Sequence, residues 1–237
     1  MRKYRCPKKP DILLDMRINQ YLSVHGYCSR RMADHLVSEG KVRVNGKLAV
    51  IGQQVSDKDV IEVDKQTARK ISTERIYLAF YKNKGIDTHA VPKLLKKNVF
   101  PVGRLDKNSR GLIILTNDGR ITDKLLNPKY DHEKEYLVEV DKKLRPGFLQ
   151  HMREGIKIDD YVTRPANVTK LADNKFRIIL TEGRHHQIRR MCDAFGYTVR
   201  DLKRVRIMHL TLGNLQPGKA RQLQGSEREE LLKSLGL

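Results

Sequence analysis

The chain has 237 residues, of which 39% are hydrophobic, so it is long enough for one large domain or a small domain joined to a medium one. No apolar run approaches the roughly 20 residues that span a bilayer, and no apolar stretch follows the basic residues 1–10 as it would in a signal peptide. Lys and Arg number 48 against 28 acidic residues, and the net charge of +20 indicates a polyanionic partner such as nucleic acid. A solvated surface that only keeps the protein in solution is the alternative explanation of this charge.

The cysteines indicate a reducing compartment. Cys6, Cys28 and Cys192 are widely spaced and odd in number, so they suggest neither a metal-binding motif nor a disulfide framework. We therefore expect a cytoplasmic monomer that has no membrane association and that holds no metal and no cofactor.

Two short helices are predicted after a basic leader over residues 1–15. The first covers 17–24 and ends at Gly26, a residue type that is common just after a helix. The second covers 30–39, and Ser29 can accept a hydrogen bond from its first turn as an N-cap. Its expected inward-facing residues are Met32, Ala33, Leu36 and Val37.

A hairpin follows the second helix. Residues 41–44 alternate charged and apolar side chains, and Asn45-Gly46 is the preferred dipeptide of a two-residue type I′ turn. A further strand over 60–63 closes a small module, residues 16–64, and the polar residues 65–74 have the pattern of a linker.

The remainder, residues 75–237, is predicted to be an α+β domain. Short strands dominate it, and because strands and helices do not alternate regularly, the sheet should be mixed or antiparallel. Strands are expected at 77–81, 112–116, 136–140, 176–180 and 208–212, and helices near 121–127, 146–154 and 186–195.

Basic residues gather around the second helix and the hairpin of the first module. The order Ser-Arg-Arg, then Val-x-Val-Asn-Gly, then a short strand resembles the S4 RNA-binding domain, whose helix pair and hairpin present basic groups to structured RNA. A basic, solvated helix face is the alternative explanation. The resemblance implies RNA contacts for Arg17, Ser29, Arg30, Arg31, Lys41, Arg43 and Asn45.

The segment 100–112 of the second domain carries a candidate reactive carboxylate. Asp106 lies between cations, and Gly103 and Gly111 permit a tight path on either side of it. The cations should lower the pKa of Asp106 and keep it ionised, so that it can act as a nucleophile or a base. The residue types alone fit a turn aspartate in a surface salt bridge equally well. The cations concerned are Arg104, Lys107 and Arg110.

This segment resembles the active-site motif of the RsuA-type pseudouridine synthases, in which Gly-Arg-Leu-Asp is followed by Leu-Ile-x-Leu-Thr-Asn-Asp-Gly. Segments 133–138 and 182–191 are similar to the tyrosine strand and the basic motif of that family, and 199–212 to its closing segment. The first motif of the family has a proline that residues 81–85 lack. Together with the S4-like module, the resemblance covers 17–223.

The resemblance implies a role for several residues. Asp106 is the expected catalytic carboxylate, Tyr136 would stack on the target base, Leu202 would pack against the uracil, and Arg189 would form an ion pair with Asp106. Taken singly, Tyr136 and Leu202 are also typical of a core and Arg189 of a phosphate contact. Arg104 is an expected substrate-binding residue. Further RNA contacts are expected at Lys107, Arg184, Arg190 and Arg204.

The expected activity is site-specific isomerisation of uridine to pseudouridine in ribosomal RNA. Segments 131–136 and 204–208 are most similar to family members that modify large-subunit rRNA, so 23S rRNA is favoured over 16S rRNA or tRNA. Asp106 would either attack C1′ or abstract the C2′ proton, and the sequence leaves both routes open.

Two other hypotheses are a non-catalytic RNA-binding or ribosome-assembly factor and a basic DNA-binding protein. His185-His186 has no carboxylate or cysteine at metal-ligand spacing.

Overall fold

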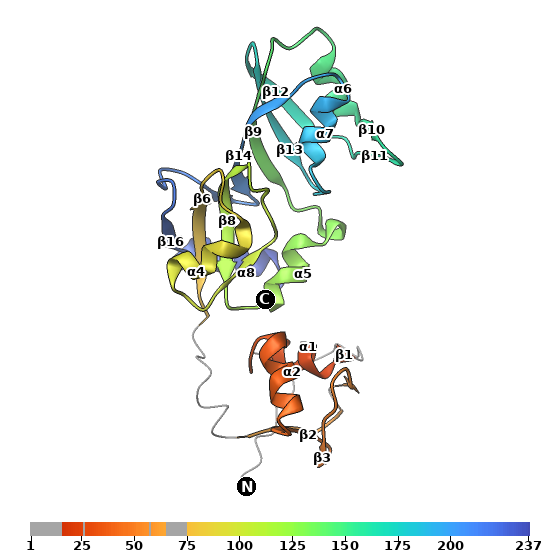
Figure 1. The fold of residues 1–237 in the computed structure, drawn as a ribbon, viewed down its shortest axis with the longest axis vertical. Coiled ribbons are helices and arrows are strands. Elements are labelled where there is room, and N and C mark those ends of the chain that lie inside the picture. Colours follow the sequence, from red (N-terminus) through yellow and green to blue (C-terminus); the bar gives the residue numbers. More distant parts are fainter. Residues whose placement is uncertain (1–15, 26, 57, 65–74) are drawn as a thin grey trace. The chain divides into compact units, whose positions relative to one another are not determined.

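The computed structural model describes residues 16–25, 27–56, 58–64 and 75–237 (Figure 1). The leader predicted over 1–15, the helix end predicted at Gly26 and the linker predicted over 65–74 lie outside the described residues. One compact unit contains the described residues up to Arg75 together with Asn117–Arg120, and the other contains 76–116 and 121–237. The domain boundaries proposed from the sequence stay predictions.

The first unit contains the two predicted helices and a small sheet. Helix α1 covers Ile18–Val24 and α2 covers Arg30–Ser38, with the Ser29 hydroxyl accepting a hydrogen bond from Met32 N at 3.3 Å as the expected cap. The sheet has the order β3-β2-β5, and a separate antiparallel pair joins β1 to β4. The strands are β1 (Met16–Arg17), β2 (Val42–Val44), β3 (Lys47–Leu48), β4 (Gln54–Val55) and β5 (Ile61–Val63).

The turn between β2 and β3 has the predicted geometry. Val44 pairs with Lys47, and the two loop residues between them have positive φ angles, 50° for Asn45 and 80° for Gly46. Two consecutive positive φ angles in a two-residue loop define the type I′ turn. The Asn45 side chain also ties this turn to the segment before β5, because it donates to Asp59 Oδ1 at 2.8 Å and accepts from Val60 N at 2.8 Å.

The core of the first unit differs from the prediction at one residue. Ala33, Leu36 and Val37 are buried as expected, but Met32 is 49% exposed, so its predicted inward position is wrong. The spacing i, i+3, i+4 that starts at Ala33 already fills the buried face of α2, and Met32 is rotated about 100° away from Ala33 around the helix.

One mixed sheet forms the centre of the second unit. Within the described residues it has nine strands, in the order β12-β13-β9-β14-β8-β6-β16, with β15 paired to β14 and β7 paired to β8. The β14–β8 pair is parallel and the other pairs are antiparallel, which confirms the predicted mixed sheet. Its strands are β6 (Tyr77–Lys82), β7 (Phe100–Val102), β8 (Arg110–Thr116), β9 (Lys134–Val140), β12 (Asn167–Ala172), β13 (Lys175–Leu180), β14 (Val199–Ile207), β15 (Leu210–Thr211) and β16 (Ala220–Gln222).

The strand predicted over 208–212 is shorter in the structure, where β15 covers only Leu210–Thr211. The chain instead forms the long strand β14 before this point, and Met208, with a φ of 53°, begins the turn into the short strand β15. Strand β14 was not recognised in the sequence, because many of its side chains are polar and their partners are distant in the sequence. Strands β12 and β16 and helices α4 and α8 were not predicted either.

Helices cover the sheet of the second unit in different places (Figure 1). Alternate residues of β6 and β8 pack against α5 and α8 in one cluster and against α4 in another, which explains why both strands are continuously apolar. Strands β9, β12 and β13 pack instead against α6 and α7. The helical elements are η1 (Thr88–Ala90), α4 (Val91–Leu95), α5 (Arg120–Leu126), η2 (Pro128–Tyr130), α6 (Phe148–Glu154), α7 (Gln187–Asp193) and α8 (Gly225–Ser234), and a hairpin joins β10 (Lys157–Ile158) to β11 (Tyr161–Val162).

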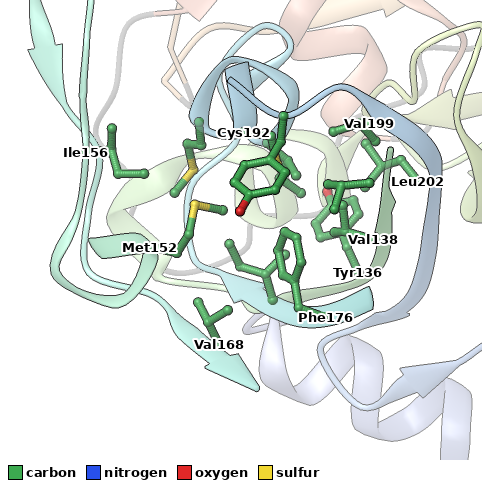
Figure 2. Packing of buried hydrophobic residues seen from close by; sticks show 14 of the residues in the cluster. Tyr136, Val138, Met152, Ile156, Val168, Phe176, Cys192, Val199 and Leu202 are labelled. Atoms are coloured by element: carbon green, nitrogen blue, oxygen red, sulfur yellow. The ribbon is translucent and has the colours of Figure 1, made fainter. Parts of the chain in front are cut away.

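The core behind β9 also contains two residues that were expected at the active site. Figure 2 shows Tyr136 and Leu202 together at one side of this cluster, with Met152 and Ile156 at the other. Cys192 is fully buried in the same cluster, and burial raises the pKa of its thiol to about 12. Tyr136 and Leu202 therefore have one side in the core, as the alternative explanation from the sequence required.

Strands β8 and β14 approach each other closely at one glycine. Gly111 pairs with Arg204 and has a φ of +115°, and a Cβ placed on it would lie 2.2 Å from the Arg204 carbonyl oxygen. Because no side chain fits into that space, glycine is required for this pairing.

Candidate active site

A cavity of about 420 Å³ lies in the second unit, beside the loop between β7 and β8. That loop, the first part of β9, the middle of β14 and the segment 182–188 form its walls. The structure brings together Arg104, Asp106, Tyr136 and Leu202 at this cavity, and places Arg184 and Arg204 there as well. Residues about 100 positions apart in the sequence therefore meet at one place.

The main chain on both sides of Asp106 is held in place. The buried Thr88 hydroxyl donates to the Leu105 carbonyl oxygen at 2.6 Å and accepts from Leu105 N at 3.1 Å. On the other side, the Asp106 carbonyl oxygen accepts from Ser109 N at 2.9 Å and closes a tight turn. Gly103 precedes the loop with a φ of +81°, which favours glycine. The carboxylate therefore stands on a loop that is fixed before any substrate binds.

A buried lysine ties the same loop to the end of β6. Lys82 is 0% exposed, and its Nζ donates to the carbonyl oxygens of Asn83 at 3.0 Å, Lys107 at 3.2 Å and Ser109 at 2.7 Å. Burial lowers the pKa of Lys82 to about 8, although the nearby Asp106 acts in the opposite direction. Residues 81–85, which lack the proline of the family motif, therefore still contain the end of β6. Lys82 fastens this strand end to the loop that carries Asp106.

The side-chain partner of Asp106 is a histidine. His186 Nε2 lies 3.4 Å from Asp106 Oδ1, and the Asp106 side chain is 30% exposed. His186 directly precedes α7 with a φ of 53°, and its ring stacks on that of His185 at a centroid distance of 4.0 Å. The left-handed backbone at this point directs the His186 ring toward the carboxylate.

The expected ion pair between Arg189 and Asp106 is wrong. Arg189 Nη2 donates to the Asn108 carbonyl oxygen at 3.1 Å and to the Ser109 hydroxyl at 3.2 Å, and Nη1 donates to the Val199 carbonyl oxygen at 3.2 Å. Arg189 lies on α7 one turn after His186, so its guanidinium reaches the turn behind Asp106. It does not line the cavity.

The cations near Asp106 in the sequence have different surroundings. Arg104 and Lys107 are exposed, but Arg110 pairs with Asp201 at 2.7 Å and donates to the Tyr81 hydroxyl. The expectation that Arg110 acts directly on Asp106 is therefore wrong. Its position at the start of β8 places it opposite the neighbouring strand β14, where Asp201 lies.

The basic residues of segments 182–191 and 199–207 have partners within the protein. Arg204, expected to contact RNA, is only 4% exposed and lines the cavity; its Nε donates to the Leu112 carbonyl oxygen at 2.7 Å and its Nη1 to the Arg104 carbonyl oxygen at 3.4 Å. Its contact with RNA stays a prediction. Arg184 lies over the Tyr161 ring at 4.0 Å, and Arg190 forms an ion pair with Asp159.

The sequence interpretation missed several residues that build the site. Glu182 accepts from Gln187 Nε2 at 2.6 Å, and Gln187 Oε1 accepts from Arg184 N at 3.0 Å, so two buried polar residues hold one wall. Lys134 lines the cavity two residues before Tyr136, where the alternation of a strand places it on the same face. Its spacing from Tyr136 was a signal that could have identified it. Thr88 and His186 gave no comparable signal.

The expected RNA contacts of the first unit are mostly exposed. Arg17, Arg30, Arg31 and Arg43 are open to solvent, and Lys41 forms an ion pair with Glu39 at 2.8 Å. Ser29 is exposed but is used as the cap of α2. These residues leave a basic surface along α2 and the hairpin.

Neither a metal cluster nor a membrane helix occurs in the part of the chain that the structure describes. No group of three or more His, Cys, Asp or Glu side chains there could hold a metal ion. No helix there is both long enough and apolar enough to cross a bilayer.

A loop-borne carboxylate in a basic cavity with an aromatic wall, in a chain that also has an S4-like unit, defines an enzyme that acts on RNA. The sequence matches the family model described as RNA pseudouridylate synthase over residues 77–194 and the S4 domain model over 16–61. The chain belongs to the pseudouridine synthase family, whose members isomerise uridine in RNA to pseudouridine.

Similar proteins extend this assignment over most of the chain. The dual-specificity RNA pseudouridine synthase RluF of Escherichia coli strain K12 is 42% identical over 92% of this chain and 79% of its own length. Ribosomal large subunit pseudouridine synthase B of Bacillus subtilis strain 168 is 34% identical over 91% of this chain and 95% of its own. A crystal structure of a pseudouridylate synthase matches with a TM-score of 0.68 and 27% identity over 91% of this chain and 99% of that one. The predicted family and fold are thus confirmed.

Proposed function

We propose that this enzyme converts one specific uridine of 23S ribosomal RNA to pseudouridine, with Asp106 as the catalytic residue and the target base flipped out of the RNA into the cavity. The observation that carries the proposal is the convergence of Asp106, Tyr136 and Leu202 on one cavity of about 420 Å³. The base that has to turn is stacked on its neighbours in folded RNA, so an enzyme that detaches and rejoins it must take it out of its stack.

The walls of the cavity fit a flipped base. The Tyr136 ring is 9% exposed and is therefore mostly fixed by the core, with little freedom to lose on binding. Stacking of a base on such a ring contributes about 1–3 kcal/mol, which offsets part of the cost of unstacking. Leu202, also largely buried, offers an apolar surface to the other parts of the base. Both would keep the detached base in place while it turns.

The surroundings of Asp106 fit a reaction at the ribose. His186 can hold the carboxylate oriented, and the exposed Arg104 and Lys107 flank it for contacts with phosphates. From this position Asp106 would either attack C1′ or take the C2′ proton. In both cases the N1–C1′ bond breaks, and the base rejoins the sugar through C5.

The choice of RNA rests on the similar proteins and on charge. One of the relatives is named for the ribosomal large subunit, which supports 23S rRNA. Another is named as having dual specificity, so 16S rRNA and tRNA stay alternatives to be tested. The net charge of +20 and the exposed basic residues of the first unit, Arg30 and Arg31 among them, suit a large folded RNA. Action as a monomer in the cytoplasm is part of the proposal.

The decisive experiment removes the charge of Asp106. The Asp106→Asn variant should bind a 23S rRNA fragment with unchanged affinity and lose pseudouridine formation by orders of magnitude, as removal of a nucleophile does in other enzymes. Asp173→Asn is the matched control, because Asp173 is an exposed aspartate of the same unit. Full activity of Asp106→Asn would refute the proposal. Mapping pseudouridines in rRNA and tRNA from cells with and without the protein identifies the target.

The other hypotheses predict different results. A ribosome-assembly factor would tolerate Asp106→Asn but would fail when Arg30, Arg31 and Lys41 are replaced together. A DNA-binding protein would retain duplex DNA in the presence of an excess of structured rRNA in a competition gel shift.

A further inference from the structure

Of the Lys and Arg residues that line the cavity, Lys134 and Arg204 are the two that are not exposed, and the described residues provide no counter-ion for either. Lys134 donates to the His132 carbonyl oxygen at 3.0 Å, and Arg204 donates only to carbonyl oxygens, while its Nη2 is buried and has no hydrogen-bond partner. Neither side chain makes an ion pair within the described part of the chain. The two carboxylates that line the cavity lie against other groups: Asp106 Oδ1 is 3.4 Å from His186 Nε2, and Glu182 accepts from Gln187 Nε2.

The two cations are close enough to disfavour each other. Burial and the charge of Arg204 both lower the pKa of Lys134. Arg204 pairs with Tyr136 across β14 and β9, and Lys134 lies two residues before Tyr136 on the same face. Lys134 is half-buried and Arg204 is buried, and neighbouring cations that lose contact with water without an anion cost free energy. Such arrangements are typical of functional sites.

The reaction itself supplies the missing anion. If Asp106 attacks C1′, its oxygen–C1′ bond forms while N1–C1′ breaks, and the negative charge moves from the carboxylate to the base. If Asp106 takes the C2′ proton, a C1′–C2′ double bond forms while N1–C1′ breaks, and the base again leaves with the electron pair. By either route the detached uracil is a monoanion with its charge spread over N1, O2 and O4.

We infer that Lys134 is a catalytic residue that contacts the detached uracil and stabilises its negative charge. The guanidinium of Arg204 adds to the positive potential at the cavity. This inference rests on the proposed reaction of a flipped uridine in the same cavity. The intact uridine base is neutral, so the two cations interact with it weakly. They interact strongly with the anion that forms as the bond breaks, and only such a differential interaction accelerates the chemical step. Arg204 Nη2 is itself enclosed, so Arg204 acts through its charge and Lys134 makes the contact.

The test compares two substrates that differ in the stability of the leaving base. Fluorine at C5 withdraws electrons and stabilises the uracil anion, so cleavage of 5-fluorouridine needs the cation less than cleavage of uridine does. The assay follows breakage of the N1–C1′ bond in single turnovers, with saturating enzyme, on RNA that carries either nucleoside at the target position. RNA affinity is measured in parallel.

Lys134→Met keeps much of the side-chain length and removes the charge. It should slow cleavage of uridine about 10²-fold, the loss typical of one deleted electrostatic contact. The loss on 5-fluorouridine should be clearly smaller, and RNA affinity should be unchanged. Lys134→Arg retains the charge and should retain most of the rate. Lys175→Met is the control, because Lys175 is an exposed lysine on β13 whose ammonium pairs with Glu139.

Several outcomes would overturn the inference. Equal losses on uridine and 5-fluorouridine would show a merely structural role, and a loss of affinity with an unchanged rate would show that Lys134 binds a phosphate. If circular dichroism shows that Lys134→Met is unfolded, Lys134→Arg is tested instead. The rate loss of Lys134→Arg should be small, and it must still be greater on uridine than on 5-fluorouridine. Asp106→Asn separates this inference from the proposed function, because it should cleave neither substrate. If Asp106→Asn is inactive while Lys134 variants fail the comparison, only the role of Lys134 is refuted.

Discussion

Replacing Gly111 with alanine tests how closely the active site depends on the approach of β8 to β14. A Cβ at this position would lie 2.2 Å from the Arg204 carbonyl oxygen and 2.6 Å from Arg204 N, whereas ordinary contacts begin near 3.4 Å. The strands would therefore have to separate by about 1.2 Å, the difference between 3.4 and 2.2 Å. Both neighbours are main-chain atoms, so no side-chain rotation can relieve the overlap.

The stability cost has two parts. A non-glycine residue with a positive φ costs about 1–2 kcal/mol, and overpacking of a tightly packed site costs about 1–3 kcal/mol more. We expect Gly111→Ala to lose about 3 kcal/mol of unfolding free energy, which corresponds to about 6–12 °C in melting temperature for a chain of this size. Because Arg204 and Leu202 would move with β14 relative to Asp106, activity should fall about 10²-fold, as it can for a misplacement of about 1 Å.

A matched glycine separates the overlap from the backbone strain. Gly213 also has a positive φ, +52°, but a Cβ there would meet nothing within 4 Å. Gly213→Ala should therefore lose only about 1 kcal/mol and keep its activity. Urea unfolding followed by circular dichroism measures the stability of both variants, and single-turnover pseudouridine formation measures their activity. Equal stability losses in the two variants, with activity retained in both, would refute this account of the strand pairing.

Three further predictions follow from the anchoring of the Asp106 loop and from burial. Thr88→Val removes both hydrogen bonds to Leu105, so two buried main-chain groups lose their partner. We expect the free energy of unfolding to fall by about 2–4 kcal/mol and the reaction to slow. Thr88→Ser should retain stability in urea unfolding and rate in activity assays. Burial lowers the pKa of Lys82 from 10.5 to about 8, so between these pH values the folded chain binds fewer protons at this site than the unfolded chain does. Wild-type stability should therefore rise relative to Lys82→Met between pH 7.5 and pH 10 in urea titrations, and a constant difference would contradict the assignment. Burial raises the pKa of Cys192 to about 12, so iodoacetamide at pH 8 should label it far more slowly in the folded than in the urea-unfolded protein, as peptide mass spectrometry would show.

Features that depend on neighbouring residues could be predicted from the sequence. The Ser29 cap and the Asn45-Gly46 turn are set by side-chain and backbone preferences within a few residues, and the structure has both. The apolar runs of β6 and β8 were equally clear, because both strands are buried on two faces. Motif spacing then identified the segments that carry Asp106 and Tyr136.

Features that depend on long-range pairing could not be predicted. Strand β14 has a charged sequence, yet it lies in the centre of the sheet, because its charges find partners on other strands. Arg206 pairs with Glu133 and Glu135 at 2.8 Å each, and Asp201 pairs with Arg110. None of these partners is within 60 residues in the sequence, so no local pattern of charge could reveal this strand.

The side-chain partner of Asp106 could not be predicted from the sequence either. His186 and Arg189 lie at the two ends of the first turn of α7, and both side chains reach the loop of Asp106. Which of them meets the carboxylate depends on the left-handed φ of 53° at His186, and no motif specifies that angle. The segment 182–188 that resembles this motif does line the cavity, but the ion pair that the resemblance implied is not formed.

The position of β14 has a consequence for synthesis of the enzyme. This strand lies between β9 and β8 in space, yet the ribosome makes it after both of them. A nascent chain that ends before Val199 therefore has two separate half-sheets, each with an open edge. Such late closure between distant segments is slow in other proteins, since loop entropy must be lost before the strand contacts form. The cavity beside Asp106 is therefore completed only late in synthesis, once β14 has been made.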